Sequence, residues 1–244
     1  AIPDLRALAP RAPVIVMTAF GDLDTAVRTV TAGAFDYLVK PFDLDKVATV
    51  VARALVERAG DDTAVAPEEE AAPRLVGSGP RMQEVFKQIA LVANTDLPVL
   101  VTGAAGTGKE LVARAIHAHG GRRDRPLVAT SLAALAPGAV EGELFGHDRP
   151  GLFELAAGGT LLLDEIDAAP MDVQAKLLRA LDSGAFTRAG STAATAADVR
   201  VIAATDRDLA AATAAGTFRA DLFERLRVLS IAVPSLAARP EDIE

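Results

Sequence analysis

The sequence predicts an α/β protein with parallel sheets, and three observations carry that prediction. Short apolar runs alternate with segments of helical period, which is the element order of a parallel sheet. One apolar run, residues 99–101, opens into a glycine-rich turn followed by an amphipathic segment. Another, residues 161–163, ends in two adjacent carboxylates, Asp164 and Glu165. Polar residues that follow the strands of such a sheet occupy its usual ligand-binding positions.

Composition sets limits on the function. The chain has 244 residues, half of them hydrophobic, with a net charge of −8 and no cysteine. The acidic balance argues against a general nucleic-acid binder. The missing cysteines exclude disulfides and thiolate metal sites and suit a cytoplasmic protein. No apolar run approaches the roughly 18 residues that a membrane span needs. Because no signal peptide opens the chain and both ends look cut, we expect a cytoplasmic fragment with no membrane partner.

The first part of the chain reads as alternating short elements. We expect a helix end at 2–8, a strand at 14–17, a helix from Asp22 or Asp24 to a stop at Gly33, a strand at 37–39 and a helix over 44–58. Thr18 and Lys40 follow the two strands. On residue type alone they are a weak signal for an anion site, and ordinary strand-end residues are the alternative.

Residues 60–74 are acidic and contain two prolines, so they predict a linker and a domain boundary. Beyond the linker the pattern predicts further helices and strands. Helices are expected at 80–92, 171–181 and 218–226, strands at 127–129 and 199–204, and a mainly helical segment at 132–144 that is interrupted at 137–138.

The glycine-rich turn has the spacing G-x-x-x-x-G-K, with a strand before it and a helix after it. Glycines let backbone N–H groups turn toward phosphate oxygens, the helix N-terminus adds partial positive charge, and Lys109 adds a full charge. The alternative is a glycine-rich turn that binds nothing. Glu110 occupies the position where a Ser or Thr usually holds Mg²⁺. Metal binding must then depend on other groups, or on Thr107 with water.

Asp164 and Glu165 divide naturally into a metal-coordinating carboxylate and one that polarises the attacking water. Downstream of a phosphate loop they indicate hydrolysis of a nucleoside triphosphate. The polar end of the strand at 199–204, which includes Asp206, could sense a γ-phosphate. Arg219 and Arg225 are either arginine fingers acting on a neighbouring subunit or surface ion pairs with Asp221 or Glu224.

Residues 1–58, which include VIVMTAFGDLDTAVRTVTAGAFDYLVKPFDLDKV, resemble the second half of a response-regulator receiver domain, a flavodoxin-like fold. The resemblance implies that Thr18 and Lys40 contact a phosphoryl group, that Tyr37 is the switch aromatic and that Lys40–Pro41 is a cis bond. The family's phosphoaccepting Asp and Mg²⁺-binding acidic pair would precede Ala1. The half-domain as given is therefore not expected to be phosphorylated by the family mechanism.

Residues 75–244 resemble the AAA+ ATPase domain of NtrC-type bacterial enhancer-binding proteins, the activators of sigma-54 RNA polymerase. The motifs are GAAGTGKE, ELFGHD, GGTLLLDEI, VRVIAATDRDL and FRADLFERL. Glu110 is the family's usual residue after the lysine. The resemblance implies a half-receiver at 1–59, a linker at 60–74 and a P-loop α/β domain at 75–244 that stops before its helical lid. It also implies that DNA is bound only through a domain absent from these residues.

Carried over residue by residue, the resemblance implies ATP and Mg²⁺ as cofactors. Lys109 would bind the β- and γ-phosphates, Asp164 the Mg²⁺, and Glu165 would activate water. Arg219 and Arg225 would reach a neighbouring protomer in a ring, usually a hexamer. The remaining nucleotide contacts would come from Val76 and Gly77 near the adenine, from Asp206, and from Gly103, Ala104, Ala105, Gly106, Thr107, Gly108 and Glu110.

Four departures from the family pattern qualify these roles. The GAFTGA loop that contacts sigma-54 is deleted, because ELFGHD runs through Arg149-Pro150 straight into GLFE; residues 184–187 only look like that motif. Ser131 replaces the asparagine that restrains the catalytic glutamate, and Asp206 replaces a sensor asparagine. The segment 234–239 has lost one arginine of the family motif.

The sequence therefore predicts the ATP-binding AAA+ module of a two-component transcriptional regulator. It would hydrolyse ATP at inter-subunit sites of a ring, with a histidine kinase and an RNA polymerase holoenzyme as partners. Without the loop it is expected not to activate the sigma-54 holoenzyme. The alternative is a degenerate, non-hydrolysing nucleotide-binding scaffold whose assembly is signal-controlled, and a third reading is a truncated product without activity. Ser131 and Asp206 favour the scaffold, while Lys109, Asp164, Glu165 and the two arginines favour hydrolysis.

Overall fold

The structure is a computed structural model that describes residues 2–9, 12–19, 21–42, 44–56, 75–77, 79–136 and 138–242. It divides into two compact units. The first comprises Ala1–Leu91 with Arg239–Glu244, and the second comprises Val92–Ala238. The predicted linker at 60–74 lies outside the described residues, so the predicted domain boundaries stay predictions.

The first unit holds the alternating elements that the N-terminal sequence predicts. They are α1 (Ile2–Leu8), β1 (Ile15–Thr18), α2 (Leu23–Thr31), β2 (Asp36–Val39), α3 (Leu44–Val56) and most of α4 (Pro80–Ala93). β1 and β2 pair in parallel, with Ile15 opposite Asp36 and Thr18 opposite Val39. Asp22 caps α2 by accepting a hydrogen bond from Thr25 N at 2.7 Å, which decides between the two predicted caps.

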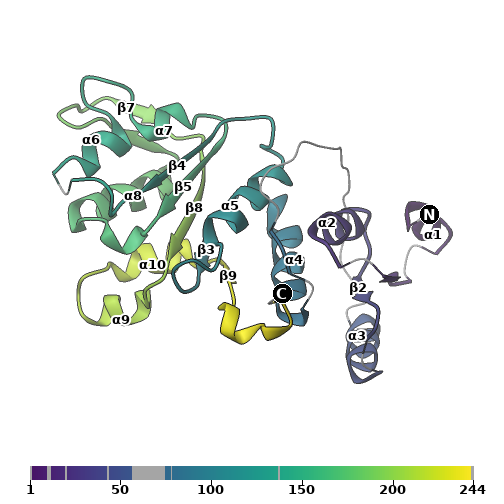
Figure 1. Cartoon of the computed structure of the whole chain (residues 1–244). Coiled ribbons are helices and arrows are strands. Elements are labelled where there is room, and N and C mark those ends of the chain that lie inside the picture. Colours follow the sequence, from purple (N-terminus) through teal and green to yellow (C-terminus); the bar gives the residue numbers. More distant parts are fainter. Residues whose placement is uncertain are drawn as a thin grey trace. The chain divides into compact units, whose positions relative to one another are not determined.

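The second unit is built on a five-stranded parallel sheet with the order β4-β5-β8-β3-β9 (Figure 1). This confirms the predicted α/β class with a parallel sheet. The strands are β3 (Val99–Thr102), β4 (Leu127–Ser131), β5 (Thr160–Asp164), β8 (Arg200–Thr205) and β9 (Leu229–Ala232). β3 is flanked by β8 and β9, so the strand that leads into the glycine-rich turn lies inside the sheet.

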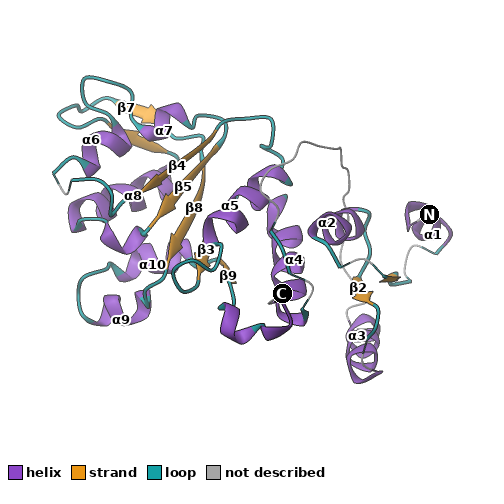
Figure 2. Cartoon of the chain, in the orientation of Figure 1, coloured by secondary structure: helices purple, strands orange, loops and turns teal. Residues whose placement is uncertain are grey.

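Helices alternate with these strands along the chain (Figure 2). They are α5 (Lys109–Ala118), α6 (Val140–Phe145), α7 (Leu152–Leu155), α8 (Met171–Ser183), α9 (Leu209–Ala214) and α10 (Ala220–Leu226), with short 3₁₀ turns at η1 (Ile166–Ala168), η2 (Leu236–Ala238) and η3 (Pro240–Asp242). No helix of the described residues is long and apolar enough to cross a membrane.

One predicted segment is wrong and several elements were not foreseen. Residues 132–144 were expected to be mainly helical, but only Val140–Phe145 lies in a helix, and residues 132–136 form turns. The helices α7 and α9, the strand β9 and the antiparallel hairpin of β6 (Ala185–Thr187) and β7 (Ala194–Ala196) were not predicted.

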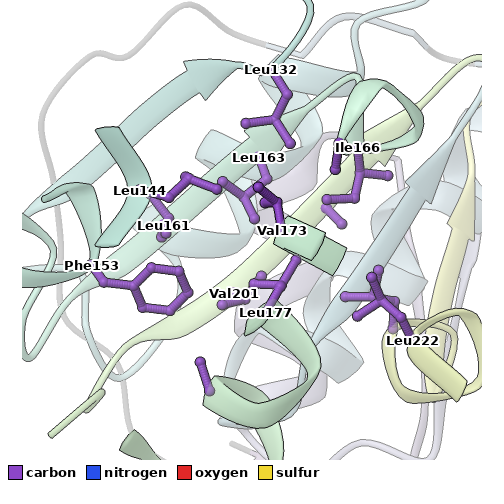
Figure 3. Packing of buried hydrophobic residues seen from close by; sticks show 14 of the residues in the cluster. Leu132, Leu144, Phe153, Leu161, Leu163, Ile166, Val173, Leu177, Val201 and Leu222 are labelled. Carbon is purple, nitrogen blue, oxygen red and sulfur yellow. The ribbon is translucent and has the colours of Figure 1, made fainter. Parts of the chain in front are cut away.

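The apolar core fixes how β5 presents its polar end. Leu161 and Leu163 of β5 and Val201 of β8 pack with Val173 and Leu177 of α8 in one buried cluster (Figure 3). Each fully buried side chain of this size contributes about 1.5–3 kcal/mol relative to exposure. A one-residue shift of β5 would turn Leu161 and Leu163 to the opposite face of the sheet, away from α8, so its register is strongly determined.

The opposite face of β8 carries a buried arginine. Arg200 donates from both terminal nitrogens to the last carbonyls of α4, Val92 O and Ala93 O, each at 2.6 Å. Burial lowers the pKa of this guanidinium to about 10. The two charge-assisted bonds reach carbonyls that the end of a helix leaves without intrahelical partners, of which Val92 O also accepts bonds from Thr95.

Candidate nucleotide-binding site

The glycine-rich turn joins β3 to α5 in the geometry that a phosphate-binding loop requires. Gly106 and Gly108 have φ values of +76° and +97°, which side chains rarely adopt. A Cβ on Gly103 would lie 2.7 Å from Val233 O, whereas one on Gly106 would meet nothing within 4 Å. Gly108 is the N-cap of α5 and supplies no capping side chain. The first N–H groups of α5 therefore have neither intrahelical partners nor a capping side chain.

Lys109 lies folded over this loop. Its Nζ donates to Gly103 O at 2.9 Å and to Ala104 O at 3.2 Å. These bonds place the ammonium group against the loop backbone. A phosphate group in the loop would offer it anionic acceptors in place of neutral carbonyls.

Glu110 and Thr107, the side chains on either side of Lys109, bond to other groups of the protein. Glu110 accepts hydrogen bonds from Arg114 one turn further along α5, at 2.7 and 3.0 Å. The Thr107 hydroxyl donates to Ala104 O at 2.8 Å within the loop. A metal-binding role of Thr107 stays a prediction.

Asp164 ends β5 and Glu165 follows it, and Ser131 lies beside Asp164 on β4. The Asp164 carboxylate accepts a hydrogen bond from Glu165 N at 2.9 Å. Glu165 adopts the left-handed conformation with φ 54° and ψ 48°, the one non-glycine residue among those described with a positive φ. The Ser131 hydroxyl donates to Glu165 Oε2. The structure thus places Ser131 on the carboxylate that the sequence assigns to water activation.

The end of β8 carries a second set of polar contacts. The Thr205 hydroxyl donates to Asp167 Oδ1 at 2.5 Å, and Arg207 Nε lies 3.4 Å from Asp167 Oδ2. Asp206 is exposed, and no ion pair of Asp206 occurs among the residues that the structure describes. Sequence reasoning did not single out Asp167, and its position three residues after Asp164 was the available signal.

The two predicted finger arginines both lie at α10 and both have partners within the chain. Arg219 makes a bidentate ion pair with Asp221, at 2.7 and 3.0 Å, as the surface interpretation expected. Arg225 donates to Leu181 O at 2.7 Å and pairs with Asp182 at 3.0 Å rather than with Glu224. Their role on a neighbouring subunit stays a prediction.

A short connection, residues 146–151, joins α6 to α7. A Cβ on Gly151 would lie 2.2 Å from Gly146 N, so the two backbone segments touch. Gly146 O accepts a hydrogen bond from Ala189 N at 2.8 Å. Arg188 makes two bonds to Glu154, at 2.6 and 3.0 Å, and holds the pKa of that carboxyl below its usual range. These contacts hold the two ends of the 146–151 connection together.

Aromatic rings support the same region. Phe145 and Phe153 stack with centroids 5.2 Å apart, and Phe186 of β6 packs on both rings. The predicted decoy segment at 184–187 thus has a structural place, because its phenylalanine fills the core beside the connection.

In the first unit, Thr18 and Lys40 end the paired strands, and Lys40 N donates to Thr18 O at 2.8 Å. Lys40–Pro41 is cis, as predicted. Tyr37 is buried and its hydroxyl donates to Gln83 Oε1 at 3.1 Å. The pKa of the Tyr37 phenol is raised, mainly by burial and to a lesser extent by the nearby charge of Asp36. Signalling roles for these residues stay predictions.

Val76 and Gly77 were expected near an adenine. Val76 is exposed, and its carbonyl accepts a bond from Arg239 at 3.4 Å within the first unit. A contact of Val76 or Gly77 with a base stays a prediction.

The arrangement fits a phosphate ligand by the open glycine cradle, the uncapped helix and Lys109. For a divalent cation it offers Asp164 at the end of β5, which β8 separates from β3 in the sheet. No group of three or more metal-ligating side chains occurs among the described residues.

A parallel sheet with a phosphate loop between its inner strand and the next helix defines a P-loop nucleotide-binding protein. The comparisons narrow this class. Residues 75–232 match the Sigma-54 interaction domain, and residues 1–52 match the Response regulator receiver domain. The chain therefore belongs to the sigma-54 interaction domain family, and its N-terminal part matches a receiver.

Two relatives match over nearly the whole chain. The chain is 45% identical to the transcriptional regulatory protein ZraR of Salmonella typhimurium, over 99% of the chain and 57% of that protein. It is 44% identical to the DNA-binding transcriptional regulator NtrC of Bradyrhizobium, over 99% of the chain and 53% of that protein. The chain thus spans a little over half the length of these relatives.

Solved structures agree. NtrX from Brucella abortus in complex with ATP matches with a TM-score of 0.68 and 39% identity, over 99% of this chain and 54% of that one. The ADP complex of the same protein matches with a TM-score of 0.67 and 38% identity, over 99% of this chain and 56% of that one. Both comparisons cover the phosphate loop and the strands around it.

Proposed function

We propose that this chain is the ATP-binding and ATP-hydrolysing module of a two-component transcriptional regulator. The observation that carries the proposal is the juxtaposition of the phosphate loop and Lys109 with the Asp164–Glu165 pair on the same parallel sheet. Similarity to an NtrX structure solved with ATP supports the choice of nucleotide.

In this proposal the loop amides and Lys109 bind the β- and γ-phosphates, and Asp164 holds Mg²⁺ together with them. Bound Mg²⁺ would supply charge neutralisation on the phosphates. Glu165 orients the attacking water and accepts its proton, with Ser131 fixing the carboxylate through one oxygen and leaving the other available.

Hydrolysis is proposed to take place between subunits of a ring. Arg225 contacts the end of α8 at Leu181 and Asp182. Positions 171 and 181 lie about 15 Å apart at the helical rise of 1.5 Å per residue, and the start of α8 is the end that follows Glu165 in the chain. This geometry favours a role of Arg225 in a neighbouring site over one in its own.

The test is ATP turnover measured against protein concentration. Turnover per subunit is expected to rise with concentration and to disappear in Glu165→Gln, while Glu143→Gln, at an exposed position of α6, keeps it. Tight ATP binding without turnover at any concentration supports the alternative, a non-hydrolysing scaffold, which Ser131 and Asp206 favour. Failure to bind either ATP or ADP refutes both functions.

We further propose that the chain does not activate the sigma-54 holoenzyme, although it belongs to the family named for that interaction. The closed connection at 146–151 supports this, because it stands where the resemblance places the contact loop. The alignments with ZraR and NtrC run over 253 and 254 positions, while the chain has 244 residues, so at least nine positions of each relative lack a counterpart.

Open-complex formation at a sigma-54 promoter is the direct measurement. A full-length NtrC protein serves as the positive control, and this chain is expected to give only background. Robust open-complex formation by the chain contradicts the proposal. A cognate histidine kinase and a different RNA polymerase holoenzyme are the partners that the proposed regulator requires.

A further inference from the structure

Asp206 directly follows a strand that borders the phosphate loop. Thr205, the last residue of β8, is the register partner of Thr102, the last residue of β3. Gly103 N donates to Thr205 O at 3.3 Å. Gly103 O in turn accepts the bond from Lys109 Nζ at 2.9 Å. Two short contacts thus connect the backbone before Asp206 to the ammonium group of the loop.

Strand alternation assigns Asp206 to the face of the sheet on which α5 lies. Val201 and Ala203 belong to the buried cluster with α8, whereas Ile202 and Ala204 are buried outside that cluster. Successive residues of a strand alternate between faces. Asp206 continues the alternation of Ile202 and Ala204, and the buried residues of α5 likewise lie outside the cluster with α8.

The cation next to Asp206 in sequence does not neutralise it. Arg207 pairs with Asp167, and Arg207 N donates to the Thr205 hydroxyl at 3.0 Å. Asp206 itself is exposed and has no ion pair within the described ranges. Its negative charge is consequently not neutralised by a neighbouring side chain within the described residues.

We propose that Asp206 makes the binding of ATP, but not of ADP, dependent on a divalent cation. The inference rests on the proposed nucleotide site. A carboxylate only accepts hydrogen bonds, so it repels a γ-phosphate where an amide side chain would donate to it. ADP lacks that phosphate and escapes most of the repulsion. A divalent cation on the β- and γ-phosphates adds positive charge beside the carboxylate.

The experiment is isothermal titration of the whole chain with ATP and with ADP, each in excess Mg²⁺ and in EDTA. For the wild type, EDTA is expected to weaken ATP binding about tenfold more than ADP binding, the size of a unit-charge repulsion at several ångströms in a partly solvated site. In Asp206→Asn, ATP affinity in EDTA is expected to rise about tenfold while ADP affinity stays within about twofold.

Asp124→Asn is the matched control. It removes the same charge from an exposed turn that precedes β4, away from the carboxyl ends of the strands. An unchanged ATP-to-ADP ratio in Asp206→Asn, or an equal change in Asp124→Asn, overturns the inference while nucleotide binding itself stands. Failure of the wild type to bind either nucleotide under any condition overturns the proposed function, and this inference with it.

Discussion

Replacing Glu165 by glycine is expected to leave the folded chain more stable than replacing it by alanine. Both variants lose the carboxylate and the bond from Ser131, so their difference isolates the backbone conformation. At φ 54° and ψ 48° a residue with a Cβ pays about 1 kcal/mol or somewhat more relative to glycine. In an ordinary helix the order is reversed, because a glycine in the helix interior lowers stability by about 1 kcal/mol relative to alanine.

The matched control pair is Arg179→Ala and Arg179→Gly, at an exposed position in the middle of α8. Thermal unfolding of all four variants, followed by circular dichroism, is the assay. We expect the glycine variant to melt about 2–4 °C above the alanine variant at position 165 and below it at position 179. Which of the two variants at position 165 melts at the higher temperature tests whether the backbone there is strained. If alanine is the more stable residue there, Glu165 is not held in a strained conformation.

Three further predictions test other contacts. Arg200→Met is expected to cost about 1–3 kcal/mol of unfolding free energy, because Ala93 O loses its charged donor while Val92 O keeps its bonds from Thr95, whereas Arg149→Met at an exposed position changes little in the same denaturant titration. Burial lowers the pKa of His117 from 6.5, so the folded chain favours the neutral ring. The contribution of His117 to the free energy of unfolding is fully present above about pH 6.5 and falls as the pH drops below that value. His117→Gln is expected to flatten this pH dependence, and an unchanged pH dependence would assign it to other groups. Mixing Glu165→Gln with Arg225→Ala, each inactive alone, is expected to restore part of the ATP turnover if Arg225 acts on a neighbouring subunit; a mixture that stays inactive contradicts that role.

Local signals predicted much of the fold and of the candidate site. The phosphate loop and the end of β5 could be located because a strand, a turn and a helix in fixed order constrain each other over a dozen residues. The cap at Asp22 and the pair of Arg219 with Asp221 are likewise contacts between residues close in sequence. For such contacts the spacing of the side chains determines the partner.

The misses have tertiary causes. Residues 132–136 are rich in leucine and alanine, which favour helix, yet Leu132 is buried in the core and the segment turns instead. The strand β9 has only four residues, too few for a reliable period, so its place beside β3 follows from pairing rather than from pattern. The partner of Arg225, Asp182, is distant in sequence, and no local rule selects it over Glu224.

The touching backbones of Gly146 and Gly151 have a consequence for engineering. A segment inserted between them would leave and re-enter the domain at almost one point, so its ends are already closed by the scaffold. The entropy of closing such an insertion grows only with the logarithm of its length. This position is therefore a natural graft site, where peptides of different lengths could be displayed from a nucleotide-binding domain whose core, held by Phe145, Phe153 and Phe186, need not be redesigned.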